Sequence, residues 1–225
     1  MCEACRGGRI VNEPEREYMF GGKSLDEFVK LAASDAPVPG GGGIAALVGS
    51  LGAAMGSMAG NFTIGRPKYA AVDAEARSIV ADLAPLIDGL LKGVDADAEA
   101  FSAISAAYRL PKTSDAESAA RKAAISAALT GAMNAPLAIL ADCLKAARRL
   151  PELAAIGNLN LLSDVEVSAI MLEAAGRAAR INVRINAGQL DAAVAAAAMA
   201  DADAATAELA ELLRITLDVV EKRRT

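Results

Sequence analysis

The sequence predicts an all-α protein, built as one antiparallel helical bundle with one long central helix. Alanine is the most abundant residue, aromatic residues make up only 3% of the chain and tryptophan is absent, so strand-forming residues are scarce. Apolar residues recur at helical spacing over long stretches, and no segment alternates as a half-buried strand would. The 225 residues are enough for one domain with a substantial core.

The helices can be placed from their start and stop signals. Capping boxes, in which a serine is followed by a glutamate three residues later, predict helix starts at Ser24, Ser114 and Ser163. Residues 1–23 lack periodicity and predict a flexible N-terminal tail, which leaves 24–225 as the helical domain. The expected helices cover residues 24–33, 44–61, 69–108, 115–149, 163–186 and 189–222, with a bend at Pro85, a kink or restart at Pro136 and a loop at 157–160.

The helix expected at 44–61 carries four glycines and no charge. Glycine destabilises a helix interior by about 1 kcal/mol relative to alanine, so its repetition predicts close approach of another backbone or of a ligand. The segment is long enough to span a membrane, but its Gly, Ala and Ser content favours a buried helix, and we expect no membrane partner. The preceding run Gly40–Gly43 is interpreted either as an anion cradle at a helix start or as a plain glycine-rich turn.

Charge and composition exclude several classes of function. The net charge of −5 argues against nucleic acid as a partner. The chain has no histidine, so any proton transfer must come from carboxylates, Lys, Tyr or Cys. Cys2 and Cys5 form a single C-x-x-C pair without the second pair that a structural zinc site needs, and we expect no metal. This cysteine usage and a polar N-terminus without a signal peptide predict a cytoplasmic protein.

One residue of the long helix does not fit its apolar stripe. Residues at alternating spacings of three and four form an unbroken seam in which Asp97 alone is charged; the others are Val80, Leu83, Ile87, Leu90, Val94, Phe101, Ile104 and Tyr108. Asp95 lies about 200° away around the helix and is expected to face water. A carboxylate on an apolar seam should have a raised pKa, as a catalytic acid does. The structural interpretation is that it pairs with an Arg or Lys from another helix or faces a partner subunit. Both interpretations remain open on periodicity alone.

Two further groups of polar residues are candidates for ligand binding. Asn158, Asn160 and Asp164 crowd an expected loop and helix start, where capping and the helix dipole can also explain them. Asn182 and Asn186 are four residues apart on a largely apolar helix. Two amides on one face suit a hydrogen-bonding ligand, or equally a helix–helix contact.

Several ordered motifs together resemble the cyclodeaminase/cyclohydrolase family of folate enzymes. The resemblance covers about residues 24–195, and its motifs are Ala36-Pro37-Val38-Pro39-Gly40-Gly41-Gly42, Thr63-Ile64-Gly65-Arg66-Pro67-Lys68-Tyr69, Val94-Asp95-Ala96-Asp97-Ala98-Glu99-Ala100-Phe101, Arg109-Leu110-Pro111-Lys112, Ala135-Pro136-Leu137, Gly157-Asn158-Leu159-Asn160 with Ser163-Asp164, and Asn182-Val183 with Ile185-Asn186.

The resemblance implies an all-helical fold, a homodimer and a folate site in a groove near the dimer interface. It places the catalytic carboxylate on Asp97, with a tetrahydrofolate derivative as substrate and no cofactor. The residues expected to bind that substrate are Gly40, Gly41, Gly42, Lys68, Tyr69, Lys112, Arg121, Asn158, Asp164, Asn182 and Asn186; the basic residues and Tyr69 are candidates for the glutamate tail or for steadying the carboxylate.

Three functions follow as alternatives. The expected activity is hydrolysis of 5,10-methenyltetrahydrofolate to 10-formyltetrahydrofolate, because the glycine run, Thr-Ile-Gly and Gly-Asn-Leu-Asn look closer to the stand-alone bacterial cyclohydrolases. The second is formiminotetrahydrofolate cyclodeaminase, which releases ammonia. The third is a helical folate-binding or scaffold protein without turnover.

Overall fold

The computed structural model describes residues 20–224, and within this range the chain is helical with no strand. The prediction of an all-α fold is therefore confirmed. In chain order the elements are α1 (Leu25–Ala32), α2 (Gly41–Asn61), the 3₁₀ helix η2 (Pro67–Val72), α3 (Asp73–Tyr108), α4 (Asp115–Ala147), α5 (Leu150–Ile156), the 3₁₀ helix η3 (Leu159–Leu161), α6 (Leu162–Ala187) and α7 (Ala192–Arg224).

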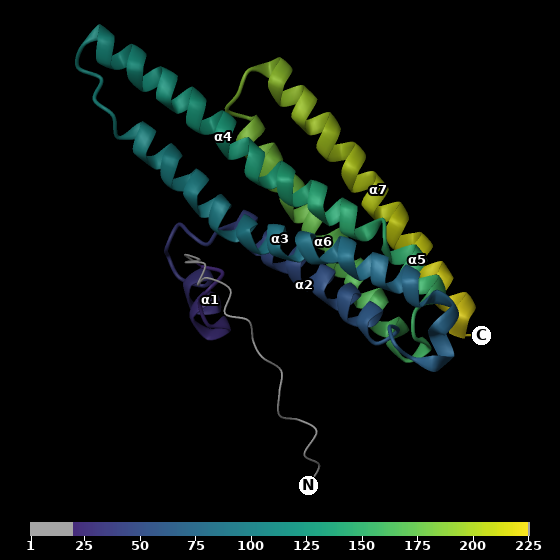
Figure 1. Ribbon diagram of the computed structural model, residues 1–225. Helices are drawn as coiled ribbons and strands as arrows, with labels where there is room; N and C mark the ends of the chain where they lie inside the picture. The colour runs from purple at the N-terminus through teal and green to yellow at the C-terminus, as the bar shows by residue number, and fades with distance from the viewer. Residues whose placement is uncertain (1–19, 225) are drawn as a thin grey trace.

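The long helices lie side by side in two layers (Figure 1). Helix α2 packs against α3 and α6, while α4 packs against α3, α6 and α7. One layer thus contains α2 and α6, and the other contains α3, α4 and α7. Short α1 lies beside the end of the bundle at which α2 begins, whereas η2, α5 and η3 lie toward the opposite end.

The glycines of α2 let this helix approach α6 closely. A Cβ at Gly52 would meet the Leu172 side chain at 3.1 Å, and one at Gly56 would meet Ser168 Oγ at 3.0 Å. The Ser168 hydroxyl donates to the Gly52 carbonyl at 2.7 Å, so the contact also carries a buried hydrogen bond. These contacts confirm the prediction that the repeated glycines mark a close backbone approach.

Two of the three predicted capping boxes are present. The boxes at Ser24 and Ser114 each make both reciprocal hydrogen bonds, to Glu27 and Glu117 respectively. The prediction at Ser163 is wrong, because η3 leads directly into α6, whose first residue is Leu162. Glu166, the expected partner of Ser163, instead accepts a hydrogen bond from the Arg224 guanidinium at 3.0 Å.

The helix bounds differ from prediction where glycine or proline was taken as a breaker. Helix α2 begins at Gly41, inside the glycine run, because three of its glycines adopt the first helical turn. Helices α3 and α4 continue through Pro85 and Pro136, so the expected restart at Pro136 is wrong. Residues 150–156 form the separate helix α5.

The seam of α3 is buried only over part of its length. Leu83, Leu90 and Val94 are almost completely buried, whereas Phe101 and Tyr108 are 42% and 47% exposed. The reason is that the last turns of α3 and the first turns of α4, joined by residues 109–114, project beyond the other helices as a two-helix arm (Figure 1). The apolar seam therefore continues past the core onto a protruding surface.

Part of the expected tail lies on the bundle. Phe20 is buried, and its N–H donates to Asp95 Oδ1 at 2.7 Å, so Asp95 does not simply face water as expected. The rest of the predicted tail, including Cys2 and Cys5, lies outside the described residues. Cys143 is completely buried at α4, and burial raises the pKa of its thiol to about 12.

Two helical stretches of the described chain are long and apolar enough to cross a membrane: Gly41–Asn61 and Asp115–Ile156. Just over half of the first stretch, 56%, is buried inside the bundle, as befits a core helix. Length and composition of this kind are weak evidence for a span.

A carboxylate pocket as the candidate functional site

Asp97 lies in a cavity of about 180 Å³ where α2, α3, α4 and α6 meet. The cavity wall is mostly apolar or backbone, and it consists of Pro37, Val38, Gly40, Gly41, Asp97, Ala100, Phe101, Ile104, Ala132, Asn182, Ile185 and Asn186. Of the predicted substrate-binding residues, the structure brings Gly40, Gly41, Asn182 and Asn186 to this cavity. Asp97 is its single ionisable side chain.

The beginning of α2 holds the Asp97 carboxylate. The Gly43 N–H donates to Asp97 Oδ2 at 2.9 Å, which fixes one carboxylate oxygen, and Oδ1 has no donor among residues 20–224. A Cβ at Gly42 would collide with the same carboxylate. The glycine run therefore surrounds the protein's own Asp97 carboxyl group.

The environment of Asp97 favours its protonated form. Burial raises the pKa of this carboxyl above its ordinary value, and the hydrogen bond from Gly43 opposes the rise only in part. No cationic side chain of residues 20–224 forms an ion pair with Asp97. Within residues 20–224, the structure thus contradicts the interpretation that Asp97 is one half of a buried ion pair.

The two amides of α6 are each anchored through their NH₂ groups. Asn182 Nδ2 donates to the Ala178 carbonyl one turn earlier at 3.0 Å, and Asn186 Nδ2 donates to the Ala132 carbonyl of α4 at 2.9 Å. The side-chain oxygens of both residues have no donor in the described part of the chain. The cavity therefore presents hydrogen-bond acceptors from α6 as well as from Asp97.

A second group of predicted site residues lies at the other end of α2. Lys68, Tyr69 and Asn158 line a separate open cavity of about 540 Å³, together with Phe62, Arg66, Pro67, Asn160 and Leu161. Helix α2 has 21 residues, so at about 1.5 Å per residue the two cavities are roughly 30 Å apart. The structure therefore does not bring these residues to Asp97 within one chain.

This second group forms a closed hydrogen-bond network. Asn158 Nδ2 donates to the Phe62 carbonyl at 3.0 Å, and Asn158 Oδ1 accepts from the Tyr69 hydroxyl at 3.3 Å. The Leu159 N–H donates to the Tyr69 hydroxyl oxygen at 3.1 Å. The Lys68 ammonium lies 5.6 Å from the centroid of the Tyr69 ring. Asp164 lies near this end, in the first turn of α6.

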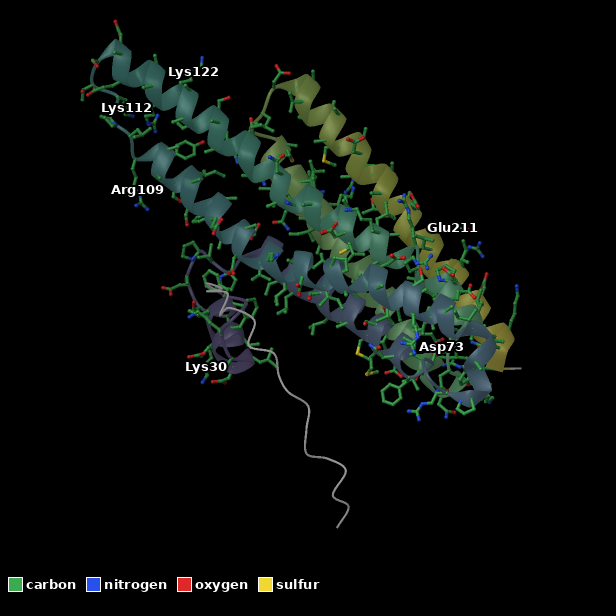
Figure 2. The ribbon with its side chains drawn as sticks, in the orientation of Figure 1. Lys30, Asp73, Arg109, Lys112, Lys122 and Glu211 are labelled. Atoms are coloured by element: carbon green, nitrogen blue, oxygen red, sulfur yellow. The ribbon has the colours of Figure 1, made fainter. Side chains whose placement is uncertain are left out.

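The remaining two predicted residues lie on the arm. Arg121 donates to the Tyr108 carbonyl at 3.1 Å and lies over the Tyr108 ring, so it joins α4 to α3. It also lines a third cavity, of about 340 Å³, on the outer surface of α4. Figure 2 shows Lys112 at the tip of the arm with Arg109 and Lys122, and Asp73 at the opposite end of the bundle.

Three residues that matter to the pocket are absent from the predicted site. Gly43 supplies the N–H to Asp97, Ala132 supplies a carbonyl to Asn186, and Ile185 adds an apolar wall. Backbone groups leave no side-chain signal, which explains why the first two were missed. The signal for Ala132 was present in one respect, because Pro136 follows it by four residues and cannot bond to its carbonyl.

The fold and the site define a class: helical bundles whose pocket holds one partly buried carboxylate without a cationic partner among residues 20–224. Sequence comparison gives that class a family. Residues 24–205 match the formiminotransferase-cyclodeaminase family, and the chain belongs to it. The resemblance read from the motifs is thereby confirmed.

Curated relatives of the chain are enzymes. A methenyltetrahydrofolate cyclohydrolase from Methylorubrum extorquens is 42% identical over 177 residues, which cover 77% of this chain and 83% of that protein. A formimidoyltransferase-cyclodeaminase from Gallus gallus is 37% identical over 73% of this chain. The match covers only 30% of that longer protein.

A solved structure shares the whole fold. The crystal structure of formiminotetrahydrofolate cyclodeaminase from Thermotoga maritima superposes with a TM-score of 0.80 at 26% identity, and the match covers 91% of this chain and 98% of that one.

Proposed function

We propose that this protein hydrolyses 5,10-methenyltetrahydrofolate to 10-formyltetrahydrofolate, with Asp97 as the general acid and base. The observation that carries the proposal is the Asp97 carboxylate itself, held by Gly43 in a largely apolar cavity with its pKa raised. The similarity to the Methylorubrum extorquens cyclohydrolase, over most of both chains, supports this choice of substrate.

The reaction needs a proton to be taken and then returned. The substrate's methenyl carbon bridges two nitrogens and is electron-poor, so a water oxygen bonds to it while the ionised Asp97 accepts a proton from that water. The neutral carboxyl then protonates the N5 nitrogen as the carbon–N5 bond breaks. The hydroxyl proton leaves to solvent as the formyl carbonyl forms. One water is consumed and one proton is released.

The raised pKa of Asp97 suits both halves of this cycle. A carboxyl with its ordinary pKa near 4 is a weak base and is almost never protonated near neutral pH. Burial brings the pKa of Asp97 closer to the working pH, so each protonation state becomes accessible without a histidine.

The test is the decay of the methenyl chromophore, measured with and without protein in a buffer where spontaneous hydrolysis is slow. We expect acceleration that falls by about 10²- to 10⁴-fold in Asp97→Asn, the range for a general acid or base. Glu99→Gln is the matched control, because Glu99 is an exposed carboxylate two residues further along α3. No acceleration by folded protein, or equal loss in both variants, would contradict the proposal.

Formiminotetrahydrofolate cyclodeaminase is the second candidate. The Thermotoga maritima cyclodeaminase structure matches almost all of the present fold, which favours testing this activity directly. The same carboxyl could protonate the departing ammonia. Incubation with 5-formiminotetrahydrofolate and an ammonia readout distinguishes the two activities. Absence of activity in both assays would favour the third candidate, a folate-binding or scaffold protein.

We also propose that the protein works as a homodimer through the exposed face of α2 and α6. Seven large apolar side chains of α2, its C-cap residue and α6 are between 37% and 58% exposed: Ile44, Leu51, Phe62, Val167, Ile170, Ile181 and Ile185. Along each helix they recur at spacings that keep them on one face. A contiguous apolar stripe of this kind marks an interaction site.

Charge favours an antiparallel pairing of the two copies. One end of the stripe carries the Asp97 pocket and the other carries Arg66 and Lys68. Antiparallel packing brings these cations of one copy toward the carboxylate pocket of its partner, whereas parallel packing places like charges together. A substrate whose head group lies in the Asp97 pocket of one copy would then have its glutamate carboxylates near Lys68 of the other copy.

Light scattering during size exclusion tests this assembly. Wild-type protein should have the mass of a dimer, and Leu51→Glu should have that of a monomer because it buries an unpaired charge in the stripe. Val194→Glu is the control, since Val194 is a similarly exposed residue on α7. A wild-type monomer would contradict the proposal.

We propose a cytoplasmic location for the enzyme, as expected for a folate enzyme with this cysteine usage.

A further inference from the structure

The orientation of one pocket amide is fixed by a proline on another helix. In a regular α-helix the N–H of each residue donates to the carbonyl four residues earlier. Residue 136 of α4 is proline, which has no N–H, so the Ala132 carbonyl lacks its helical donor. Asn186 Nδ2 of α6 donates to this carbonyl at 2.9 Å.

The Ala132 carbonyl is buried, so it needs the hydrogen bond that Asn186 donates. Ala132 is 4% exposed and lies in the wall of the Asp97 cavity. A buried carbonyl without a partner is unfavourable. If the amide turned over, its oxygen would oppose the Ala132 oxygen and two acceptors would meet. The Asn186 NH₂ group is therefore committed to α4, and its oxygen is the atom left for the cavity.

We propose that Pro136 is a positioning residue of the pocket, which acts through Asn186 to present a fixed hydrogen-bond acceptor to the substrate's head group. The head group must then donate an N–H at this position. This identification rests on the proposed folate function, because the bicyclic head of tetrahydrofolate carries N–H donors. The polarity of the pocket itself rests only on the Pro136, Ala132 and Asn186 contacts.

The size and lining of the cavity agree with such a head group. Pockets for whole drug-sized ligands measure about 300–1,000 Å³, so about 180 Å³ admits only part of a folate molecule. Its polar side chains are Asp97, Asn182 and Asn186, and all three present oxygen acceptors. A ligand that donates hydrogen bonds to these oxygens should bind. A ligand that offers only acceptors would leave the oxygens of the cavity without partners.

The first variant is Pro136→Ala, which returns an N–H to α4 at the position that can bond to Ala132. The Asn186 amide is then free to turn. We expect the Kd for 5-formyltetrahydrofolate, a stable folate with the same bicyclic head, to rise about three- to tenfold by calorimetry, as for loss of one hydrogen bond. KM for the methenyl substrate should rise similarly with kcat little changed, because Asp97 is untouched.

Pro85→Ala is the matched control. Pro85 is also inside a continuous helix, but it is exposed on α3 and does not line the cavity. Both substitutions should leave the thermal midpoint unchanged or higher, because a helix-interior proline is removed in each. Only Pro136→Ala should weaken binding. Equal Kd values for Pro136→Ala and wild type would overturn the proposal.

Asn186→Asp supplies a second, binding-independent test. The new carboxylate has no N–H for Ala132, so the variant should have a lower thermal midpoint in the wild-type background. In the Pro136→Ala background the Ala132 carbonyl has a backbone donor, and the penalty of Asn186→Asp should shrink clearly. Additive shifts in the double variant would contradict the Pro136–Asn186 coupling.

The side-chain amide resonance of Asn186 gives a third readout. Its assignment follows from its disappearance in Asn186→Asp, and its hydrogen exchange should be slow in wild type and fast in Pro136→Ala. If wild-type protein neither binds nor turns over folates while the coupling and the protected amide persist, the proposed function fails and the positioning role of Pro136 stands. If folates are bound but the coupling between Pro136 and Asn186 is absent, the positioning role of Pro136 fails and the proposed folate function stands.

Discussion

The two ends of α2 use the same kinds of residue in opposite ways. At the Asn61 end, Asn158 has donors and acceptors satisfied by Phe62, Tyr69 and Asn160, so its amide builds a loop. At the Gly41 end, Asn182 and Asn186 use only their NH₂ groups and leave their oxygens open. Asp97 likewise keeps one oxygen that has no donor within the described range, residues 20–224. The binding site is therefore distinguished by side-chain oxygens that have no donor in the described residues, more than by the presence of polar residues.

Substitution of Gly42 by alanine should give the largest effect. The new Cβ would collide with the Asp97 carboxylate and push it from its position beside Gly43. A displacement of about 1 Å at a reacting group can reduce turnover about 10²-fold, and we expect at least that loss in the cyclohydrolase assay.

Gly131→Ala is the control for that experiment. Gly131 lies in α4 with nothing within 4 Å of a Cβ, so alanine should stabilise the helix by about 0.5–1 kcal/mol without loss of activity. Full activity in Gly42→Ala would show that the carboxylate position is not critical at that end of α2.

The next largest effect distinguishes the closed network from the open pocket. Asn158→Ala removes three side-chain hydrogen bonds and should destabilise the fold by about 2–3 kcal/mol, which corresponds to a thermal midpoint lower by roughly 4–12 °C. KM should stay near wild type at temperatures where the variant is folded. Asn182→Ala should show the opposite pattern, a higher KM with little thermal change. The same changes in KM and thermal midpoint in both variants would contradict the distinction between the two ends of α2.

Lys68→Ala tests whether the far end contributes across a dimer. In an antiparallel pair the Lys68 ammonium approaches the partner's pocket, and its loss should raise KM a few-fold for a substrate with glutamate carboxylates. The effect should decrease at high salt because it is electrostatic. Lys145→Ala, on an exposed lysine of α4 paired with Asp142, should leave KM unchanged. A salt-independent change, or none, would argue against this geometry.

The smallest effect concerns stability and pH at Asp97. Because its pKa is raised in the folded state, the folded chain binds this proton more tightly than the unfolded chain, and the carboxylate destabilises the fold as pH rises above its ordinary pKa near 4. Asp97→Asn should therefore have an equal or higher thermal midpoint at pH 7, and the difference should vanish toward pH 4. A lower midpoint at pH 7 would instead indicate a cationic partner.

Local signals predicted much of this fold. The boxes at Ser24 and Ser114 begin helices as expected, and the charged exception in the α3 seam led directly to Asp97. The box at Ser163 failed because the 3₁₀ helix η3, whose Leu159 N–H donates to the Tyr69 hydroxyl of η2, leads directly into α6. Helix bounds set by tertiary packing have no counterpart in a spacing rule.

The site was predicted only in part, for a physical reason. Periodicity identifies which face of a helix a residue occupies, and that was enough for Asp97 and for the pair Asn182 and Asn186. It does not say which segments meet in space. Tyr69 and Asn158 were therefore predicted for the same folate site as Asp97, without any indication that about a helix length separates them within one chain. The link from Pro136 to Asn186 joins two helices and required the structure.

The reactivity of the buried Cys143 thiol can report unfolding of the bundle. A completely buried thiol with a pKa of about 12 reacts only when the surrounding helices separate, because thiolate is the nucleophile. In a variant with Cys2 and Cys5 replaced by serine, the alkylation rate of Cys143 reports how often α4 leaves the core. A ligand that binds the folded state should slow this labelling in proportion to its occupancy, so the folate pocket could be screened without any measurement of turnover.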